Sequence, residues 1–195
     1  MAMDPLYAFV FLGLFTPGPN VILLTASGAR FGFRASLPHV LGVALGVGVL
    51  AAFAGLGMGA LMAALPGVER ALKLVAAGWI LWMAWRLWQS RPSGAPDARG
   101  DRPWSIGRAV LFQWVNPKVW AVILSAASGY AAGLSPWGEA ARLSTAFAGI
   151  NLFVCLFWSF AGSLLGYLLT TPDAWRVFAR IMAMALAGSA VMVFA

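Results

Sequence analysis

Thr16-Pro17-Gly18-Pro19-Asn20 interrupts an otherwise apolar stretch that runs from Pro5 to Ala29. A proline removes a backbone donor and clashes with the carbonyl four residues before it, so a regular helix cannot continue through this segment. The residues on either side are hydrophobic enough for a bilayer, where irregular backbone is stable only inside protein or along a wet cavity. The pentapeptide therefore predicts either a packing kink or a binding site inside a membrane protein.

The composition is that of an integral membrane protein. Of the 195 residues, 62% are hydrophobic and 10% are charged, whereas soluble domains are about 45–50% apolar and about 25% charged. Six spanning helices of about 20 residues each would fill the chain and leave no room for a soluble domain. The net charge of +7 is explained by loop charges that set the orientation in the bilayer, so no nucleic-acid partner is expected.

The apolar runs predict an all-α fold of six transmembrane helices, of which the first and the fourth are broken at prolines. The expected ranges are Pro5–Ala29 with a break at Pro17–Pro19, Leu37–Leu65, Ala71–Gln89, Arg108–Ala132 with a break at Asn116–Lys118, Leu143–Leu169 and Ala174–Phe194. Asp173 is expected to cap the last helix. Residues 90–107 form a polar, flexible linker between residues 1–89 and 108–195 of one membrane domain. If the first helix were re-entrant, the chain would have five spans.

The two halves of the chain echo each other. Pro19-Asn20-Val21 and Pro117-Lys118-Val119 are each followed, 19 residues after the proline, by a second proline, Pro38 and Pro136. Each half would hold three helices, an odd number, so the halves would have opposite orientation. Such an inverted repeat places paired broken helices, and with them the substrate site, near the membrane midplane.

Charges in the connections predict how the chain crosses the membrane. Nine Lys and Arg residues belong to one end of the six-helix arrangement and three to the other. The positive-inside rule puts the nine in the cytoplasm and, with six spans, both termini outside. The nine are Arg30, Arg34, Arg86, Arg91, Arg99, Arg102, Arg108, Arg176 and Arg180.

Polar residues at the two breaks are the candidate binding residues. Lys118 is expected about 15 Å into the fourth helix, where a charge usually faces an internal cavity; alternatively, the helix starts later and Lys118 lies among the headgroups. Asn20 and Asn116 offer donors and acceptors beside helix ends whose free N–H groups attract anions and whose free carbonyls attract cations. A zwitterionic amino acid matches both signs. The alternative is that both asparagines only cap the broken helices.

Of three further side chains, two have two interpretations each. His39 would gate a proton step or make an interfacial hydrogen bond, and Asn151 would line the cavity or join two helices. The single cysteine, Cys155, cannot form an internal disulfide and is expected to pack in the core. The sequence has no Walker loop, no metal-ligand spacing and no pair of intramembrane acids, so we expect no ATP hydrolysis, no metal and no cofactor.

Thr16-Pro17-Gly18-Pro19-Asn20 and Asn116-Pro117-Lys118 together resemble the lysine-exporter (LysE/RhtB) family of bacterial amino-acid exporters. Ala77-Gly78-Trp79-Ile80-Leu81-Trp82 is similar to that family's third span, and the resemblance covers essentially the whole chain. It implies gradient-driven amino-acid efflux across the bacterial inner membrane, a fold of inverted three-helix repeats and no enzymatic activity. The residues that match the family's signatures are Pro17, Gly18, Pro19, Asn20, Asn116, Pro117 and Lys118.

We therefore expect a secondary transporter that exports amino acids or their derivatives by alternating access, with a proton as the coupling ion. A neutral substrate is favoured over a cationic one, because no intramembrane acid would pair with a side-chain cation. Two other hypotheses stay open: a membrane thiol-redox conductor, against which the lone Cys155 argues, and a non-transporting membrane scaffold. The glycine-rich second helix, with Gly42 and Gly46 at small-xxx-small spacing, permits a homodimer without requiring one.

Overall fold

The computed structural model describes residues 4–57, 66–90 and 102–191, and every regular element in these ranges is a helix. The predicted all-α class is therefore confirmed for this part of the chain. The linker predicted at residues 90–107 lies mostly outside the described residues. The eight helices described are α1 (Pro5–Phe15), α2 (Pro19–Phe31), α3 (Phe33–Gly55), α5 (Pro66–Trp88), α6 (Ile106–Gln113), α7 (Pro117–Gly129), α8 (Pro136–Leu168) and α9 (Pro172–Val191).

Both helix breaks lie where the prolines predict. The first falls between α1 and α2, which are bent by 58°, and the second between α6 and α7, which are bent by 61°. Pro19 and Pro117 each start the second helix of a pair, a position where the missing N–H has no partner within the helix to lose. The breaks in the first and fourth predicted helices are thus confirmed.

The number of spans is only partly settled by length and apolarity. Among the described helices, α3, α8 and α9 are long and apolar enough to cross a membrane, and counting each bent pair as one span raises the number to five. The third predicted span, α5, does not meet this test. It carries several tryptophans together with Lys73 and Arg86, residue types that favour the membrane interface over the hydrocarbon core. Six spans therefore remain a prediction.

Hydroxyl caps start two helices earlier than predicted. The Ser135 hydroxyl accepts a hydrogen bond from the Gly138 N–H at 3.2 Å, which starts α8 at Pro136. The Thr171 hydroxyl accepts one from the Ala174 N–H at 3.1 Å, which makes Thr171 the cap of α9. The expectation that Asp173 caps this helix is wrong.

The second predicted helix is shifted at both of its ends. It begins at Phe33 rather than Leu37, so Pro38 lies inside α3, whereas its counterpart Pro136 is the first residue of α8. It ends at Gly55, and Gly57 at φ +91° turns the chain out of the helix, a conformation that favours glycine. Most of the predicted extension to residue 65 lies outside the described residues.

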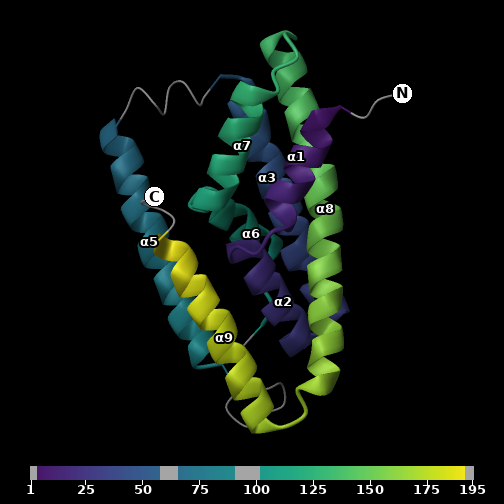
Figure 1. Cartoon of the computed structure of the whole chain (residues 1–195), viewed down its shortest axis with the longest axis vertical. Helices are drawn as coiled ribbons and strands as arrows, with labels where there is room; N and C mark the ends of the chain where they lie inside the picture. The colour runs from purple at the N-terminus through teal and green to yellow at the C-terminus, as the bar shows by residue number, and fades with distance from the viewer. Residues whose placement is uncertain (1–3, 58–65, 91–101, 192–195) are drawn as a thin grey trace.

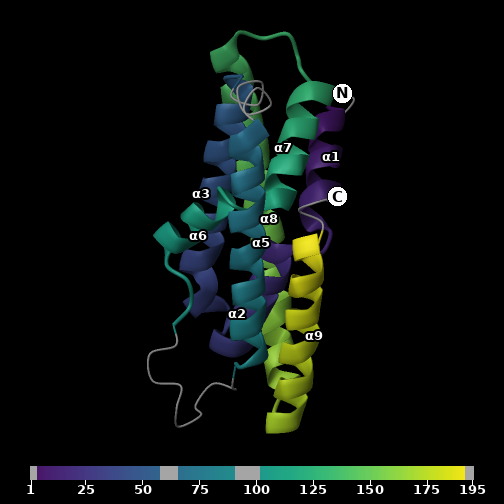
Figure 2. The same cartoon turned by 90° about the vertical axis from the view of Figure 1, so that its left-hand side faces the viewer.

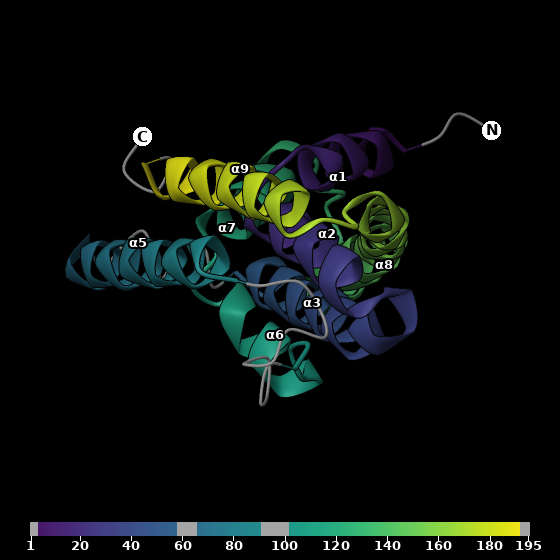
Figure 3. The same cartoon turned by 90° about the horizontal axis from the view of Figure 1, so that it is seen from below.

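Successive helices run in alternating directions along the long axis. In Figure 1 the colour order shows α1–α2 descending, α3 ascending, α5 descending, α6–α7 ascending, α8 descending and α9 ascending. The most extensive contacts join α3 with α8, α2 with α8 and α5 with α9. The helices α5 and α9 pack together on one side, while α1, α3 and α8 lie on the other (Figure 3). The short α6 lies against α3 (Figure 2).

Glycines bring α2 and α8 into backbone contact. A Cβ added to Gly28 would lie 2.1 Å from the Ser159 carbonyl oxygen, and one added to Gly162 would lie 2.2 Å from the Thr25 carbonyl oxygen. Gly166, four positions after Gly162, also faces α2. Because lipid provides no hydrophobic driving force between helices, close packing of this kind holds them together.

Gly42 and Gly46 on α3 pack within the same chain, where both face α6. A Cβ on Gly42 would lie 2.5 Å from the Ile106 carbonyl oxygen, and one on Gly46 would lie 2.7 Å from Cγ of Gln113. This pair therefore gives no support to a homodimer, which remains a prediction.

Candidate functional site

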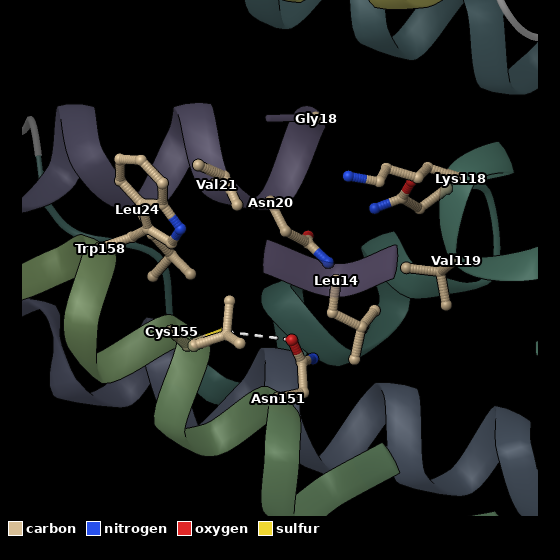
Figure 4. Close-up of a pocket in the computed structure, with 12 residues that line it drawn as sticks. Leu14, Gly18, Asn20, Val21, Leu24, Lys118, Val119, Asn151, Cys155 and Trp158 are labelled. Carbon is tan, nitrogen blue, oxygen red and sulfur yellow. Dashed lines mark hydrogen bonds between the residues drawn. The ribbon is translucent and has the colours of Figure 1, made fainter. Parts of the chain in front are cut away.

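The two helix breaks meet at a small internal cavity (Figure 4). Its volume is about 10 Å³, roughly the space that one water molecule needs. The described conformation is therefore closed around the site. The lining residues are Leu14, Gly18, Asn20, Val21, Leu24, Asn116, Lys118, Val119, Asn151, Val154, Cys155 and Trp158.

Lys118 caps the end of α1. Its ammonium donates hydrogen bonds to the carbonyl of Thr16, to Oγ1 of Thr16 at 2.8 Å and to the carbonyl of Pro17 at 3.4 Å. The C-terminal end of a helix carries a partial negative charge, so a cation is stabilised there. The structure thus places Lys118 at the break of the other helix pair, beside the cavity.

Tryptophans satisfy further carbonyls at the two breaks. The indole N–H of Trp158 donates to the carbonyl of Phe15 at 3.3 Å, and that of Trp120 donates to the carbonyl of Trp114 at 2.9 Å. Irregular backbone inside a membrane needs such partners. Sequence reasoning assigned neither tryptophan to the site.

Asn20 binds a residue that the sequence analysis missed. Its amide nitrogen donates to Oε1 of Gln113 at 2.8 Å, and the Gln113 amide donates back to Oδ1 of Asn20 at 3.2 Å. Gln113 is fully buried and also donates to the carbonyl of Ala109. The alternative that Asn20 only caps α2 is therefore not supported, because its side chain pairs with α6 and makes no capping hydrogen bond. A glutamine within an apolar run, three residues before Asn116, was the signal for this contact.

Asn116 and Asn151 present unpartnered amide atoms to the cavity. Their side chains are 1% and 2% exposed, and within the part of the chain that the structure describes, both amide atoms of Asn116 and the amide nitrogen of Asn151 lack a hydrogen-bond partner. Asn151 Oδ1 faces the Cys155 thiol, with 3.5 Å between oxygen and sulfur (Figure 4). An unpaired buried polar group costs about 1–3 kcal/mol, so this cluster indicates a polar occupant of the cavity.

Both electrostatic signs are present at the cavity or directly beside it. The residues that follow Pro19 in α2 and Pro117 in α7 line the cavity, and neither helix has a side-chain cap at its start. Free N–H groups at a helix N-terminus favour an anion. The carbonyls of Thr16 and Pro17, which now hold Lys118, favour a cation. The alternative that Asn116 only caps α7 is not supported, because its side chain makes no capping hydrogen bond.

The remaining predicted residues play other parts. Pro17, Pro19 and Pro117 shape the two breaks and are not among the lining residues. His39 does not reach this cavity and lines a second, larger one. Within residues 4–57, 66–90 and 102–191, no group of three His, Cys, Asp or Glu side chains is placed to hold a metal ion.

Apolar helices, with two bent pairs that meet around a buried cavity, define a multi-pass membrane protein. The family model described as LysE type translocator matches residues 11–195. The chain therefore belongs to the LysE family, which confirms the resemblance read from the two proline motifs. Members of this family are transporters and not enzymes, so the expected absence of an enzymatic activity is also supported.

Efflux proteins of enteric bacteria are similar over most of the chain. The cysteine/O-acetylserine efflux protein of Salmonella typhimurium (strain LT2) is 30% identical over 205 residues, which cover 100% of this chain and 98% of that protein. Its counterpart in Escherichia coli O6:H1 (strain CFT073) is 28% identical over 167 residues, 83% of each chain. No solved structure matches the chain significantly.

Proposed function

We propose that this transporter exports a neutral amino acid or derivative from the bacterial cytoplasm. O-acetylserine and cysteine are the first candidates, because similar proteins are named for their efflux. The observation that carries the proposal is the set of buried, unpartnered amide atoms of Asn116 and Asn151 beside Lys118, where the two helix breaks meet.

The substrate would occupy this site by exchanging with Lys118. The ammonium group of the substrate would bind the carbonyls of Thr16 and Pro17 in place of Lys118. The substrate's carboxylate would lie at the starts of α2 and α7, where the released Lys118 would bind it. The polar side chain of the substrate would pair with the free amide atoms of Asn116 and Asn151. No acidic residue is among those lining the cavity, so a side-chain cation would lack a partner, which favours neutral substrates.

Transport would proceed by alternating access. The closed cavity is too small for an amino acid, so the two bent pairs must separate to admit one. Contacts between counterpart helices, α3 with α8 and α5 with α9, support two inverted repeats (residues 1–89 and 108–195) that rock around the site. The proposed arrangement has six spans with both termini outside the cytoplasm. An ion gradient would drive it, and Lys118 or His39 would carry a coupling proton.

Reconstituted protein tests this proposal directly. Proteoliposomes loaded with O-acetyl-L-serine, L-cysteine or L-lysine should release the first two and retain lysine, and collapsing the pH gradient should stop uphill movement. Comparable lysine efflux would contradict the neutral preference. Release of no amino acid from folded protein would contradict export by this chain. Cys155→Ser should leave efflux intact. Loss of efflux in this variant would instead favour the hypothesis of a thiol-redox conductor.

A further inference from the structure

A second cavity of about 410 Å³ lies between α2, α3, α5 and α6. We call it the vestibule. Its volume is in the range of small-molecule sites, about 300–1,000 Å³. Four arginines line it, and none of the described lining residues is acidic. All four belong to the set predicted to face the cytoplasm: Arg30, Arg86, Arg102 and Arg108.

Trp104 contacts both His39 and Arg108 in one wall of the vestibule. The His39 ring stacks on Trp104 with 4.9 Å between ring centroids, and the Arg108 guanidinium lies 4.5 Å from the Trp104 ring centroid. This distance is within the range of a cation–π contact, and a guanidinium carries a fork of N–H donors that can bind a carboxylate with two hydrogen bonds. Arg108 has no ion pair with any residue in the described ranges.

His39 offers the second half of a binding site. Its side chain is 1% exposed and lines the vestibule. In the described part of the chain, neither ring nitrogen has a hydrogen-bond partner. A neutral imidazole has one donor and one acceptor, and buried polar atoms normally have partners. An unpaired ring beside Arg108 therefore points to a ligand with both an anionic and a hydrogen-bonding group.

We propose that the vestibule is a loading site for the outgoing amino acid, where Arg108 binds the carboxylate and His39 hydrogen-bonds the amino group. This inference rests on the proposed export function. The helix α2 separates the two cavities: Val21 and Leu24 face the central one, whereas Leu23 and Ala26 face the vestibule. A substrate would therefore pass from one site to the other when α2 moves against its neighbours.

Binding to the full chain with the central site disabled tests the proposal. Lys118→Met protein in phosphatidylcholine nanodiscs should still bind O-acetyl-L-serine in calorimetric titration. Adding Arg108→Gln should weaken this binding about tenfold or more, the usual effect of losing a charged hydrogen bond. Arg34→Gln, on α3 outside the vestibule, is the matched control and should change it by about twofold at most. His39→Leu should weaken binding, and His39→Gln should restore part of it.

Binding measurements with other ligands and another lipid identify what the vestibule binds, without a change to the protein. The methyl ester of O-acetyl-L-serine, which lacks the carboxylate, should bind about tenfold more weakly or not at all. Inorganic phosphate and phosphatidylglycerol nanodiscs test the other sources of an anion. Equal binding of acid and ester, equal effects of Arg108→Gln and Arg34→Gln, or occupation by phosphatidylglycerol in place of the amino acid would each overturn the proposal.

Efflux kinetics separate this inference from the proposed function. In proteoliposomes, Arg108→Gln should raise the KM for internal O-acetyl-L-serine about tenfold while the maximal rate changes by about twofold or less. Wild-type efflux with an unchanged KM in Arg108→Gln would reject the vestibule site alone. Absence of wild-type efflux would reject the exporter.

Discussion

The ammonium of Lys118 lies 2.8 Å from the Thr16 hydroxyl oxygen, a hydrogen bond that joins residues 102 positions apart. It ties the start of α7 to the end of α1. The Asn20–Gln113 pair ties the start of α2 to the end of α6. Each broken helix is thus fastened to the break of the other, and a substrate that competes for these contacts can loosen both.

Gly18→Ala should impair export by displacing Lys118. An added Cβ would lie 2.5 Å from Cδ of Lys118, so the ammonium would be pushed from the Thr16 carbonyl. The backbone itself accepts alanine, because Gly18 is extended with φ −172°. We expect efflux to fall about tenfold or more at a normal membrane level. Gly149→Ala, which meets open space, is the control; normal efflux by Gly18→Ala would contradict the role given to Lys118.

Asn20→Leu and Gln113→Leu should each destabilise the protein by about 1–3 kcal/mol, because the first leaves the buried Gln113 amide, and the second the half-buried Asn20 amide, without its partner. The double variant should cost less than the sum, with a coupling energy of about 1 kcal/mol. Thermal unfolding of the four proteins in detergent measures this cycle. Strictly additive losses would mean that the two side chains are not bonded in the membrane protein.

An ion pair at the N-terminal end should make stability depend on pH. Arg142 donates a hydrogen bond to the Asp4 carboxylate at 2.6 Å, and this contact lowers the pKa of Asp4 below its usual 3.8. The stabilisation is therefore complete above the pKa of the unfolded chain and is lost as the pH falls through the lower, folded pKa.

Asp4→Asn keeps the cap on the Leu6 N–H but removes the charge. Its melting temperature should lie below that of the wild type at about pH 7, and the gap should close below about pH 4. In an Arg142→Gln background the same change should have little effect. A gap that is constant from neutral to acidic pH would contradict the pairing.

The parts of the fold set by proline and glycine were predictable from sequence. Two helix breaks follow from Pro19 and Pro117, and the contact between α2 and α8 involves the small-residue spacing of Gly162 and Gly166. Helix starts were harder to predict, since the Ser135 cap starts α8 at Pro136, seven residues before the predicted start at Leu143. A serine or threonine cap can start a helix several residues before its apolar run begins. The residues in between are polar or contain proline and glycine, so the sequence pattern predicts a turn there.

The structure brings several of the predicted residues to one cavity, and their role in binding a substrate stays a prediction; their contacts were not predictable. The cavity is lined by Asn20, Asn116, Asn151 and Lys118. The partner of Asn20, however, depends on how α6 crosses α2, which no local pattern encodes. For the same reason His39, placed near the start of a helix by sequence, was not linked to Trp104 and Arg108.

Efflux by Lys118→Met is the most direct test of the central claim that Lys118 works at the meeting point of the two breaks. The matched control is Lys73→Met, since Lys73 is the chain's other lysine and lines neither cavity. With both variants inserted at wild-type levels, O-acetyl-L-serine efflux should fall about 100-fold in Lys118→Met and stay near wild type in Lys73→Met. Full efflux by Lys118→Met would contradict the account.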